Sequence, residues 1–400
     1  MLHKRKILKS INKWLNKDQC IFLIGARQVG KTSLLHIIKE SIDDNCKETN
    51  SQSIFYDLED FETLHYFNES PKNLIKDLQV NTAYESLDKI YVFIDEIQYL
   101  NDPSHFIKYI YDTYKKKIKL IVSSSSSFYI DKNFKDSLSG RKIIFEIMPL
   151  DFDEFLLFRG KRKYRKADFQ DLSPNDKREM KNLLEEYSRF GSYPAVVLEP
   201  EFQLKKLILK ELINSYLKKD VLENQIRYPD KFYKLVKILA ENTGAQINNN
   251  ELANSLDLSY STVENYLYIL EKTFYIKTIK PFYKNLRKEL TKMPKIFLLD
   301  MGVRNYLLDD FKEFDKRLDK GAFLENLYFK FLTDNFPDKK INYWRTTDQK
   351  EIDFIIPDEC LAIEVKSKKA KARSKAKKEF LENYPEFDFS FRDYEDLLEF

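Results

Sequence analysis

Short apolar runs alternate with amphipathic, helix-like segments over the first third of the chain. The runs, rich in β-branched and aromatic residues, are CIFLIG (20–25), SIFYDL (53–58), KIYVFID (89–95), IKLIVSS (118–124) and KIIFEIMPL (142–150). Apolar strands that alternate with helices are typical of a parallel sheet covered on both faces. The pattern therefore predicts an α/β domain, with a parallel sheet, over residues 1–150.

The rest of the chain divides into three further segments. Residues 151–228 place apolar side chains three and four positions apart, which predicts a helical region that would act as a lid. Residues 229–284 show two helices, a turn, a third helix and a hairpin within FYIKTIKPFYK (274–284), the order of a winged-helix domain. Residues 285–400 combine KIFLLD, a helical run and two strand patterns, which predicts a second α/β domain.

Composition places the chain among ordered, water-soluble proteins. Of 400 residues, 43% are hydrophobic, 14% aromatic and 33% charged, whereas disordered chains are poor in aromatic residues. Neither a signal sequence nor about 20 consecutive apolar residues is visible, so we expect a cytoplasmic protein without a membrane segment. The three cysteines and four histidines do not cluster, which argues against a disulfide framework or a zinc site. A net charge of +4 permits binding to nucleic acid without requiring it.

A glycine-containing loop follows the first apolar run. Gly25, Gly30, Lys31 and Thr32 fit the spacing G-x-x-x-x-G-K-[ST], between a strand pattern and a helix pattern. Glycines let the backbone turn tightly, so that N–H groups at the start of the helix face phosphate oxygens. Lys31 would reach the β- and γ-phosphates of ATP, and the Thr32 hydroxyl would ligate Mg²⁺. The predicted nucleotide-binding residues are Gly25, Ala26, Arg27, Gln28, Val29, Gly30, Lys31, Thr32 and Ser33.

An acidic pair ends the third apolar run, in YVFIDEIQYL. Asp95 and Glu96 would emerge at the carboxyl edge of a buried strand, where ligands of α/β sheets bind. Asp95 would hold Mg²⁺ through water, and Glu96 would polarise an attacking water molecule. The pair therefore predicts hydrolysis of ATP, while the alternative is an acidic strand cap that faces solvent.

Two further features lie near the same predicted edge. A hydroxyl among Ser123–Ser126, at the end of the next strand, would sense the γ-phosphate or orient the water, although a serine run is otherwise an ordinary loop. Arg141, in LSGR, would neutralise charge in the transition state, in its own chain or in a neighbouring subunit. A salt bridge is the alternative role for this arginine.

Several of these motifs together resemble a known family. GARQVGKTS (25–33), IDEIQ (94–98), the serine strand end, SGR with PLDFDEFL, and GSYPAVV (191–197) are similar to the prokaryotic AAA-type ATPases that carry a C-terminal nuclease-like domain. The resemblance covers most of the chain, and it implies a P-loop NTPase fold that binds and hydrolyses ATP. It names the chemistry better than the purpose, because the biological role of these proteins is mostly unassigned.

The predicted winged helix suggests a nucleic-acid partner. Its last helix would begin near Ser259 and expose Tyr260, Ser261, Thr262 and Asn265, where recognition helices contact bases. The acidic residues on this helix, such as Glu264, oppose binding to DNA, so a module that contacts a protein, or is purely architectural, stays open.

The final domain holds a second constellation of charged residues. Glu364 and Lys366 share one face of a predicted strand, Asp353 lies in the strand before it, and Glu325 lies in the preceding helix. This D…ExK pattern resembles the PD-(D/E)XK nucleases. The resemblance implies that the three carboxylates bind Mg²⁺ and that Lys366 positions water. The alternatives are a surface hairpin with an incidental salt bridge and a nuclease fold kept for binding alone.

Together these patterns predict an ATP-driven, DNA-associated protein. The catalytic residues would be Lys31, Glu96 and Arg141, and DNA would contact the winged helix and the lysine-rich region 366–378. That lysine run could instead be a solvated helix face. The alternative function is a nucleotide-switched interaction or regulatory protein with an inert nuclease-like fold. The sequence leaves a protein partner and oligomer formation open.

Overall fold

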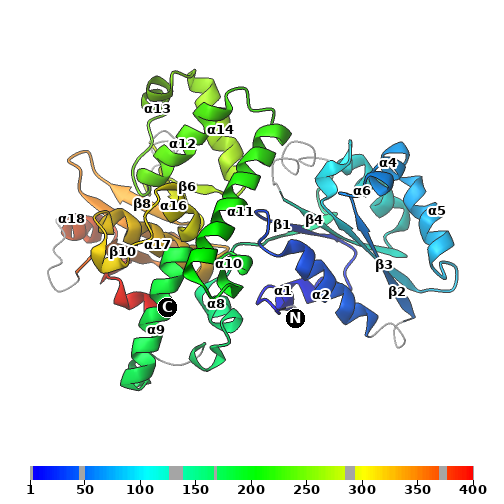
Figure 1. The fold of residues 1–400 in the computed structure, drawn as a ribbon, viewed down its shortest axis with the longest axis horizontal. Coiled ribbons are helices and arrows are strands. Elements are labelled where there is room, and N and C mark those ends of the chain that lie inside the picture. The colour runs from blue at the N-terminus through cyan, green and yellow to red at the C-terminus, as the bar shows by residue number, and fades with distance from the viewer. Residues whose placement is uncertain are drawn as a thin grey trace. The chain divides into compact units, whose positions relative to one another are not determined.

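The computed structural model describes residues 3–44, 50–125, 138–165, 169–283, 293–368 and 376–399. The chain forms two compact units, Met1–Met148 with Lys272–Phe274 and Pro149–Glu271 with Tyr275–Phe400 (Figure 1). Within the described residues, no helix is both long and apolar enough to cross a membrane.

A five-stranded parallel sheet forms the centre of the first unit. Its strands, in the spatial order β2-β3-β4-β1-β5, are β1 (Cys20–Ile24), β2 (Ser51–Asp57), β3 (Lys89–Asp95), β4 (Ile118–Ser124) and β5 (Lys142–Glu146). All four neighbouring pairs are parallel, and every residue of β1 and β4 is buried. This arrangement confirms the parallel α/β sheet predicted from the apolar runs. Because β4 lies between β1 and β3, its carboxyl end also lies between the ends of those two strands.

Helices connect the strands of this sheet. They are α2 (Lys31–Asp43), α4 (Phe61–Glu69), α5 (Lys72–Asn81), α6 (Pro103–Tyr114) and the 3₁₀ turn η1 (Ile97–Tyr99), whereas α1 (Leu8–Asn12) precedes β1. The start of α6 is fixed by Asp102, whose carboxylate accepts a hydrogen bond from the His105 N–H, and by Pro103 in the first turn. Its buried residues Phe106, Ile107 and Ile110 form the apolar face that such a helix places against a sheet.

The second unit begins with a helical region and continues with three further helices. The elements are α8 (Phe152–Phe158), α9 (Pro174–Phe190), α10 (Pro194–Leu198), α11 (Phe202–Glu223), α12 (Pro229–Glu241), α13 (Asn249–Leu256) and α14 (Tyr260–Lys272), with the 3₁₀ turns η2 (Arg162–Tyr164) and η3 (Phe169–Asp171). The succession of helices agrees with the sequence pattern. The predicted hairpin within residues 274–284 is wrong, because β6 (Ile276–Ile279) pairs antiparallel with β7 (Lys295–Leu298) instead. Strand β6 lies in the predicted winged-helix segment 229–284, and β7 lies in the predicted C-terminal segment 285–400. Their pairing therefore joins two segments that the sequence pattern assigns to separate domains.

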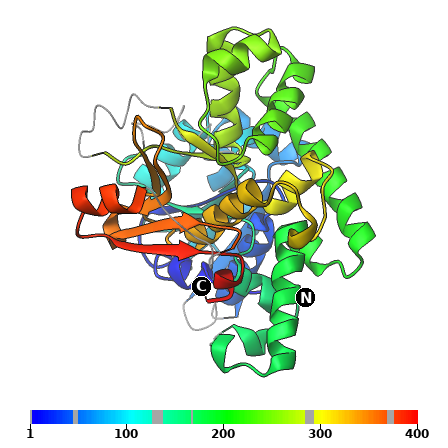
Figure 2. The same ribbon diagram turned by 90° about the vertical axis from the view of Figure 1, so that its left-hand side faces the viewer.

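The last part of the chain forms a four-stranded mixed sheet in the order β11-β10-β9-β8, coloured orange to red in Figure 2. Its elements are α16 (Met301–Leu307), η4 (Phe314–Lys316), α17 (Lys320–Asn335), β8 (Asn342–Arg345), β9 (Glu351–Ile356), η5 (Pro357–Glu359), β10 (Leu361–Val365), α18 (Ala376–Asn383), β11 (Asp388–Arg392) and η7 (Glu395–Glu399). Phe354 of β9 packs near Phe329 of α17, whereas its neighbour Ile355 joins a core that includes Phe380 of α18. Successive residues of a strand point to opposite faces, so α17 and α18 cover opposite faces of this sheet.

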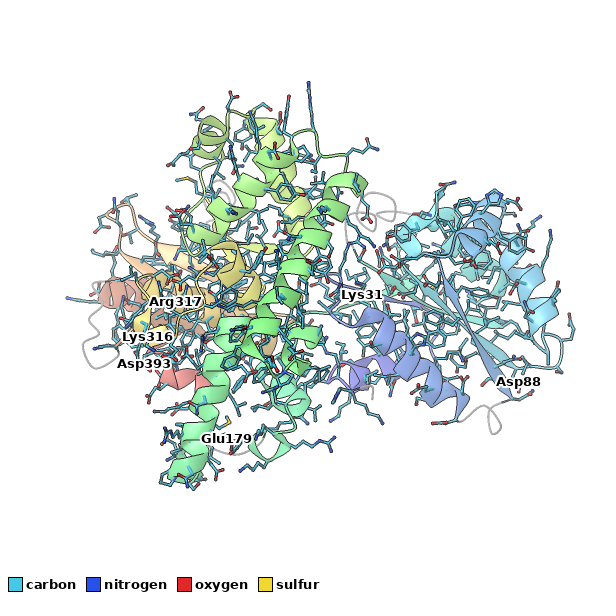
Figure 3. All side chains as sticks on the ribbon, in the orientation of Figure 1. Lys31, Asp88, Glu179, Lys316, Arg317 and Asp393 are labelled. Atoms are coloured by element: carbon cyan, nitrogen blue, oxygen red, sulfur yellow. The ribbon has the colours of Figure 1, made fainter. Side chains whose placement is uncertain are left out.

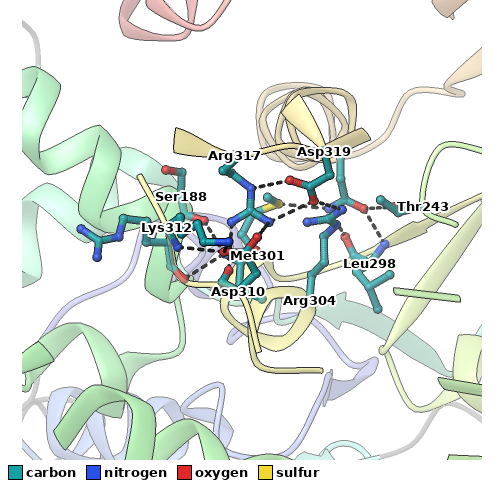
Figure 4. A network of polar contacts seen from close by, with 12 residues as sticks. Ser188, Thr243, Leu298, Met301, Arg304, Asp310, Lys312, Arg317 and Asp319 are labelled. Carbon is teal, nitrogen blue, oxygen red and sulfur yellow. Dashed lines mark hydrogen bonds and ion pairs between the residues drawn. The ribbon is translucent and has the colours of Figure 1, made fainter. Parts of the chain in front are cut away.

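Buried charged groups connect α16 with the start of α17 (Figure 4). The guanidinium groups of Arg304 and Arg317 both donate to the carboxylate of Asp319, at 2.8 Å each, and Arg317 also donates to the carbonyl oxygen of Asp310 at 2.9 Å. Burial by itself would raise the pKa of Asp319, but the two guanidinium groups lower this pKa to about 2. The shared carboxylate explains how two arginines can be buried here.

A buried amide attaches α17 to β7. Asn326 Nδ2 donates to the carbonyl oxygen of Leu298 at 3.0 Å, and the Leu298 N–H donates to Asn326 Oδ1 at 2.9 Å. The hydroxyl of Thr243 donates to the same Oδ1 atom (Figure 4). These bonds fix β7 against the helix that carries Glu325.

Candidate functional site

The loop between β1 and α2 is shaped by its two glycines. A Cβ at Gly25 would lie 2.1 Å from the carbonyl oxygen of Ile147, so only glycine fits this close backbone approach. Gly30 precedes α2 with φ 97°, and Gln28 also has a positive φ of 57°. Left-handed residues that alternate with right-handed ones turn successive N–H groups toward a common anion. The loop and the first turn of α2 therefore suit a phosphate group.

Lys31 occupies the first turn of α2 (Figure 3). Its side chain is buried, and Nζ donates to the carbonyl oxygens of Gly25 at 3.1 Å and Ala26 at 3.0 Å. Burial lowers the pKa of Lys31, while the nearby carboxylates of Glu96 and Asp95 oppose that shift. The ammonium group is thus held inside the loop, where it would meet phosphate oxygens.

Thr32, in the first turn of α2, contacts Asp95, the last residue of β3, at the carboxyl edge of the sheet. The Thr32 hydroxyl donates to Asp95 Oδ2 at 2.6 Å, and the Ser123 hydroxyl donates to Asp95 Oδ1. Burial raises the pKa of Asp95, and these two hydrogen bonds oppose the rise. A hydroxyl and a carboxylate are oxygen ligands of the kind that Mg²⁺ takes, so these residues fit the predicted metal role.

Glu96 lies beside this pair, in a strained backbone conformation with φ 53°. Its carboxylate accepts a hydrogen bond from Gln98, whose amide also donates to the Ser125 hydroxyl at 3.0 Å, and the Glu96 N–H donates to the Ser123 hydroxyl at 2.9 Å. Burial opposes ionisation, but Lys31, 4.0 Å away, and Gln98 lower the pKa of Glu96. The carboxylate is therefore held ionised and oriented.

The serine strand end lies beside Asp95 and Gln98. The Ser123 hydroxyl donates to Asp95 and the Ser125 hydroxyl accepts from Gln98, while Ser126 lies outside the described residues. The sequence motifs assign no role to Gln98, although its place two residues after Glu96, in a tight 3₁₀ turn, is a signal for one.

Arg141 was predicted to lie at the same sheet edge as the phosphate loop. In its own chain this prediction is wrong, because Arg141 lies at the opposite edge. Its carbonyl oxygen accepts from the Cys20 N–H, so Arg141 lies where β1 and β5 begin, whereas Gly25 follows the end of β1. Its guanidinium group pairs with Asp112, with 2.7 Å between Nε and Oδ1. Arg141 therefore forms a salt bridge, which is the alternative role for this arginine.

The C-terminal carboxylates assemble in a different set from the predicted one. Glu325, Glu351 and Asp353 offer oxygen atoms that all lie within 4.8 Å of one another. Glu351 is new to the set, and so is Lys295 of β7, whose Nζ lies 2.7 Å from Glu325 Oε1 and 2.6 Å from Glu351 Oε1. A β-bulge contributes to this change, because the four residues of β9 from Ile352 to Ile355 lie opposite only three residues of β8, from Asn342 to Trp344.

Burial raises the pKa of both Glu325 and Asp353. Burial would lower the pKa of Lys295, but its carboxylate neighbours raise it overall. Lys295 is therefore an ammonium ion at neutral pH, surrounded by acidic groups.

Glu364 is not among these three residues. It follows Ile363 on β10, and so shares a strand face with Ala362, which belongs to the core around α18. One carboxylate oxygen pairs with Lys366 at 2.7 Å, and the other is buried and has no hydrogen-bond partner among the described residues. The predicted pair of Glu364 and Lys366 thus exists as a salt bridge.

The start of α14 displays the residues expected there. Tyr260, Ser261 and Asn265 are exposed, and Thr262 is half-buried. The Ser259 hydroxyl accepts a hydrogen bond from the Thr262 N–H at 3.2 Å, which stabilises this helix start. Glu264 is exposed as well, so the surface carries the negative charge noted in the sequence.

Comparison with known families covers three parts of the chain. Residues 17–156 match the AAA domain, residues 181–313 match a domain of unknown function (DUF8612), and residues 320–395 match a second domain of unknown function (DUF4143). With the parallel sheet and the loop at Gly25, the first match shows that the N-terminal part has a P-loop NTPase fold and is similar to the AAA domain.

Two proteins of other organisms are similar to most of this chain. An uncharacterized protein of Methanocaldococcus jannaschii is 27% identical over 351 residues, which cover 85% of this chain and 72% of that protein. An uncharacterized protein of Haemophilus influenzae is 25% identical over 374 residues, or 91% of this chain and 86% of that protein.

Two solved structures are more remotely similar. The Aeropyrum pernix ORC1 protein in complex with DNA has a TM-score of 0.36 and 13% identity, and the similarity covers 78% of this chain and 93% of that one. AMPPCP-bound DnaA from Aquifex aeolicus has a TM-score of 0.31 and 16% identity, covering 68% and 89%. These scores are low, so the two structures say nothing further about what this chain binds.

Proposed function

We propose that this protein binds ATP with Mg²⁺ at residues 25–33 and hydrolyses it. The observation that carries the proposal is the bond between the Thr32 hydroxyl and Asp95, since it joins the loop to the acidic strand end from which a metal ion would be held. The match to the AAA domain supports ATPase activity. A glycine-rich turn that binds no nucleotide would not need a hydrogen bond between Thr32 and Asp95.

Each side chain has a defined part in the proposed reaction. Lys31 exchanges its contacts with the loop carbonyl oxygens for contacts with phosphate oxygens. Thr32 and Asp95 hold Mg²⁺, which when bound neutralises charge on the phosphates. Glu96, oriented by Gln98, accepts the proton of the attacking water.

The test is to compare wild type with Lys31→Ala and Lys31→Arg. We expect Lys31→Ala to weaken ATP affinity roughly ten- to hundredfold, because hydrogen bonds to charged groups contribute roughly 1.5–3 kcal/mol. Lys31→Arg keeps the positive charge but changes the shape of the side chain. It therefore separates the effect of charge on ATP affinity from the effect of side-chain geometry. Isothermal titration calorimetry gives the affinity, and unchanged binding by Lys31→Ala would contradict the proposal.

We also propose that the protein contacts DNA through the first turns of α14. The exposed Tyr260, Ser261 and Asn265 support this candidate, because the start of a recognition helix is where base contacts are made. A mobility-shift assay at two salt concentrations should show a shift that weakens in Tyr260→Ala. The absence of a shift at low salt would leave a protein partner as the alternative.

Cleavage of DNA is not part of this proposal. The carboxylates Glu325 and Asp353 face the ammonium group of Lys295, which supports the alternative of an inert nuclease-like fold. Nicking of supercoiled plasmid by wild type with Mn²⁺, lost in Asp353→Asn, would contradict it.

A further inference from the structure

Three carboxylates of the second unit surround one buried ammonium group. Lys295 Nζ lies 2.7 Å from Glu325, 2.6 Å from Glu351 and 4.0 Å from Asp353, and the side chain is only 2% exposed. In the described part of the chain, these same three residues are the group that could share a metal ion. The ammonium therefore lies where such an ion would bind.

We propose that Lys295 is the resident cation of this carboxylate cluster and excludes a divalent ion from it. A shared ion would need oxygen atoms about 2.0–2.6 Å away, in the space that the ammonium group fills. Binding of the ion would also require a buried lysine to leave its partners, at a high cost in stability. On this proposal, the carboxylate cluster of the C-terminal domain holds no metal ion.

The surrounding structure holds Lys295 in this place. Its strand β7 pairs with β6, and its Nζ lies 5.4 Å from the centre of the Tyr343 ring, close enough for a cation–π interaction. The hydroxyl of Tyr343 accepts from Gln246 at 2.7 Å and donates to the carbonyl oxygen of Met293 at 2.6 Å. The ring is therefore fixed beside the ammonium group.

The carboxylates are equally constrained. A Cβ at Gly244 would lie 2.9 Å from Glu325 Oε2, so the backbone of residue 244 packs closely against this group. The second oxygen of Glu351 pairs with Arg345 at 3.0 Å, and the Val365 N–H donates to Asp353 Oδ2 at 2.7 Å. Each carboxylate thus has a second neighbour, which limits its freedom to rearrange around an ion.

Binding of Mn²⁺ to the nucleotide-free full chain, followed by the electron paramagnetic resonance signal of free Mn²⁺, tests the proposal. We expect wild type and Asp353→Asn to bind Mn²⁺ equally, because the cluster takes none. Lys295→Met should gain about one ion per chain, which the double variant Lys295→Met/Asp353→Asn should lose. The matched control is Lys330→Met, a buried lysine that pairs with one carboxylate, Asp334, and should gain no ion.

Two outcomes would overturn the proposal. One is Mn²⁺ binding by wild type that Asp353→Asn abolishes, since Lys295 would then not exclude the ion. The other is a folded Lys295→Met that gains no Mn²⁺. If Lys295→Met does not fold, the comparison of wild type with Asp353→Asn still decides.

Discussion

The hydroxyl of Thr32 donates a hydrogen bond of 2.6 Å to Asp95, although 63 positions separate the two residues in the sequence. The bond forms because β1 and β3 are parallel to β4 between them, so that the elements after both strands meet at one edge of the sheet. Ligand sites of α/β sheets lie at this edge. The contact is the structural basis for placing Mg²⁺ and the phosphates of ATP here.

Thr32→Val should remove the dependence of ATP binding on Mg²⁺. Valine has the shape of threonine without the hydroxyl that would ligate the ion, and the oxygen of Asp95 loses its donor. Thr32→Ser keeps the hydroxyl and is the matched control. Calorimetric titrations with and without Mg²⁺ measure the effect, and an unchanged Mg²⁺ dependence in the valine variant would remove Thr32 from the metal site.

Gly25→Ala should destabilise the protein by more than about 2 kcal/mol, because its Cβ would lie 2.1 Å from a backbone oxygen that cannot easily move. Gly321→Ala is the control, since a Cβ there meets no atom of the described residues within 4 Å. Chemical unfolding of both variants compares their free energies of unfolding. Equal stability of the two would show that the loop does not approach Ile147 so closely.

Arg141→Ala should leave ATP turnover at the level of wild type when the protein is assayed at low concentration. The guanidinium pairs with Asp112 at the edge where β1 begins, away from the phosphate loop. Asp112→Ala, which breaks the same pair, should behave alike. A loss of turnover that appears only in Arg141→Ala, and grows with protein concentration, would instead indicate a role in a neighbouring subunit.

Gly244→Ala should destabilise the second unit by roughly 1–2 kcal/mol. The residue has φ 78°, which L-residues rarely adopt, and its Cβ would press on the Glu325 carboxylate. Gly321→Ala again provides the control at a position without a positive φ. Thermal unfolding measures the difference, and an unperturbed Gly244→Ala would show that Glu325 is free to move.

The sequence predicts the first unit well because its signals are local. The apolar runs mark all five parallel strands, and the loop at Gly25 carries its chemistry within a few consecutive residues. Arg141 was misplaced because proximity along the chain does not say at which end of a strand a residue lies. The motif shows which residues can act, and the strand direction shows which of them can meet.

Long-range pairing explains what the sequence did not predict. Lys295 starts a short strand, KIFL, and resembles an ordinary surface lysine until β7 pairs with β6 and brings it to Glu325. The bulge in β9 changes which side chains share a face, and nothing in the local pattern marks it. The sequence does not predict the strands β8 (NYWR) and β11 (DFSFR), because polar or charged residues interrupt both and neither forms a continuous apolar run.

Hydrolysis of ATP by Glu96→Gln tests the central claim most directly. The amide keeps the shape of the side chain but cannot accept a proton, so we expect ATP affinity close to wild type and turnover about 10²- to 10⁴-fold lower. Affinity by calorimetry and phosphate release should be measured on the same preparation, in the presence of Mg²⁺. Turnover at the wild-type rate by Glu96→Gln would contradict the account and leave Glu96 as a structural residue at the end of β3.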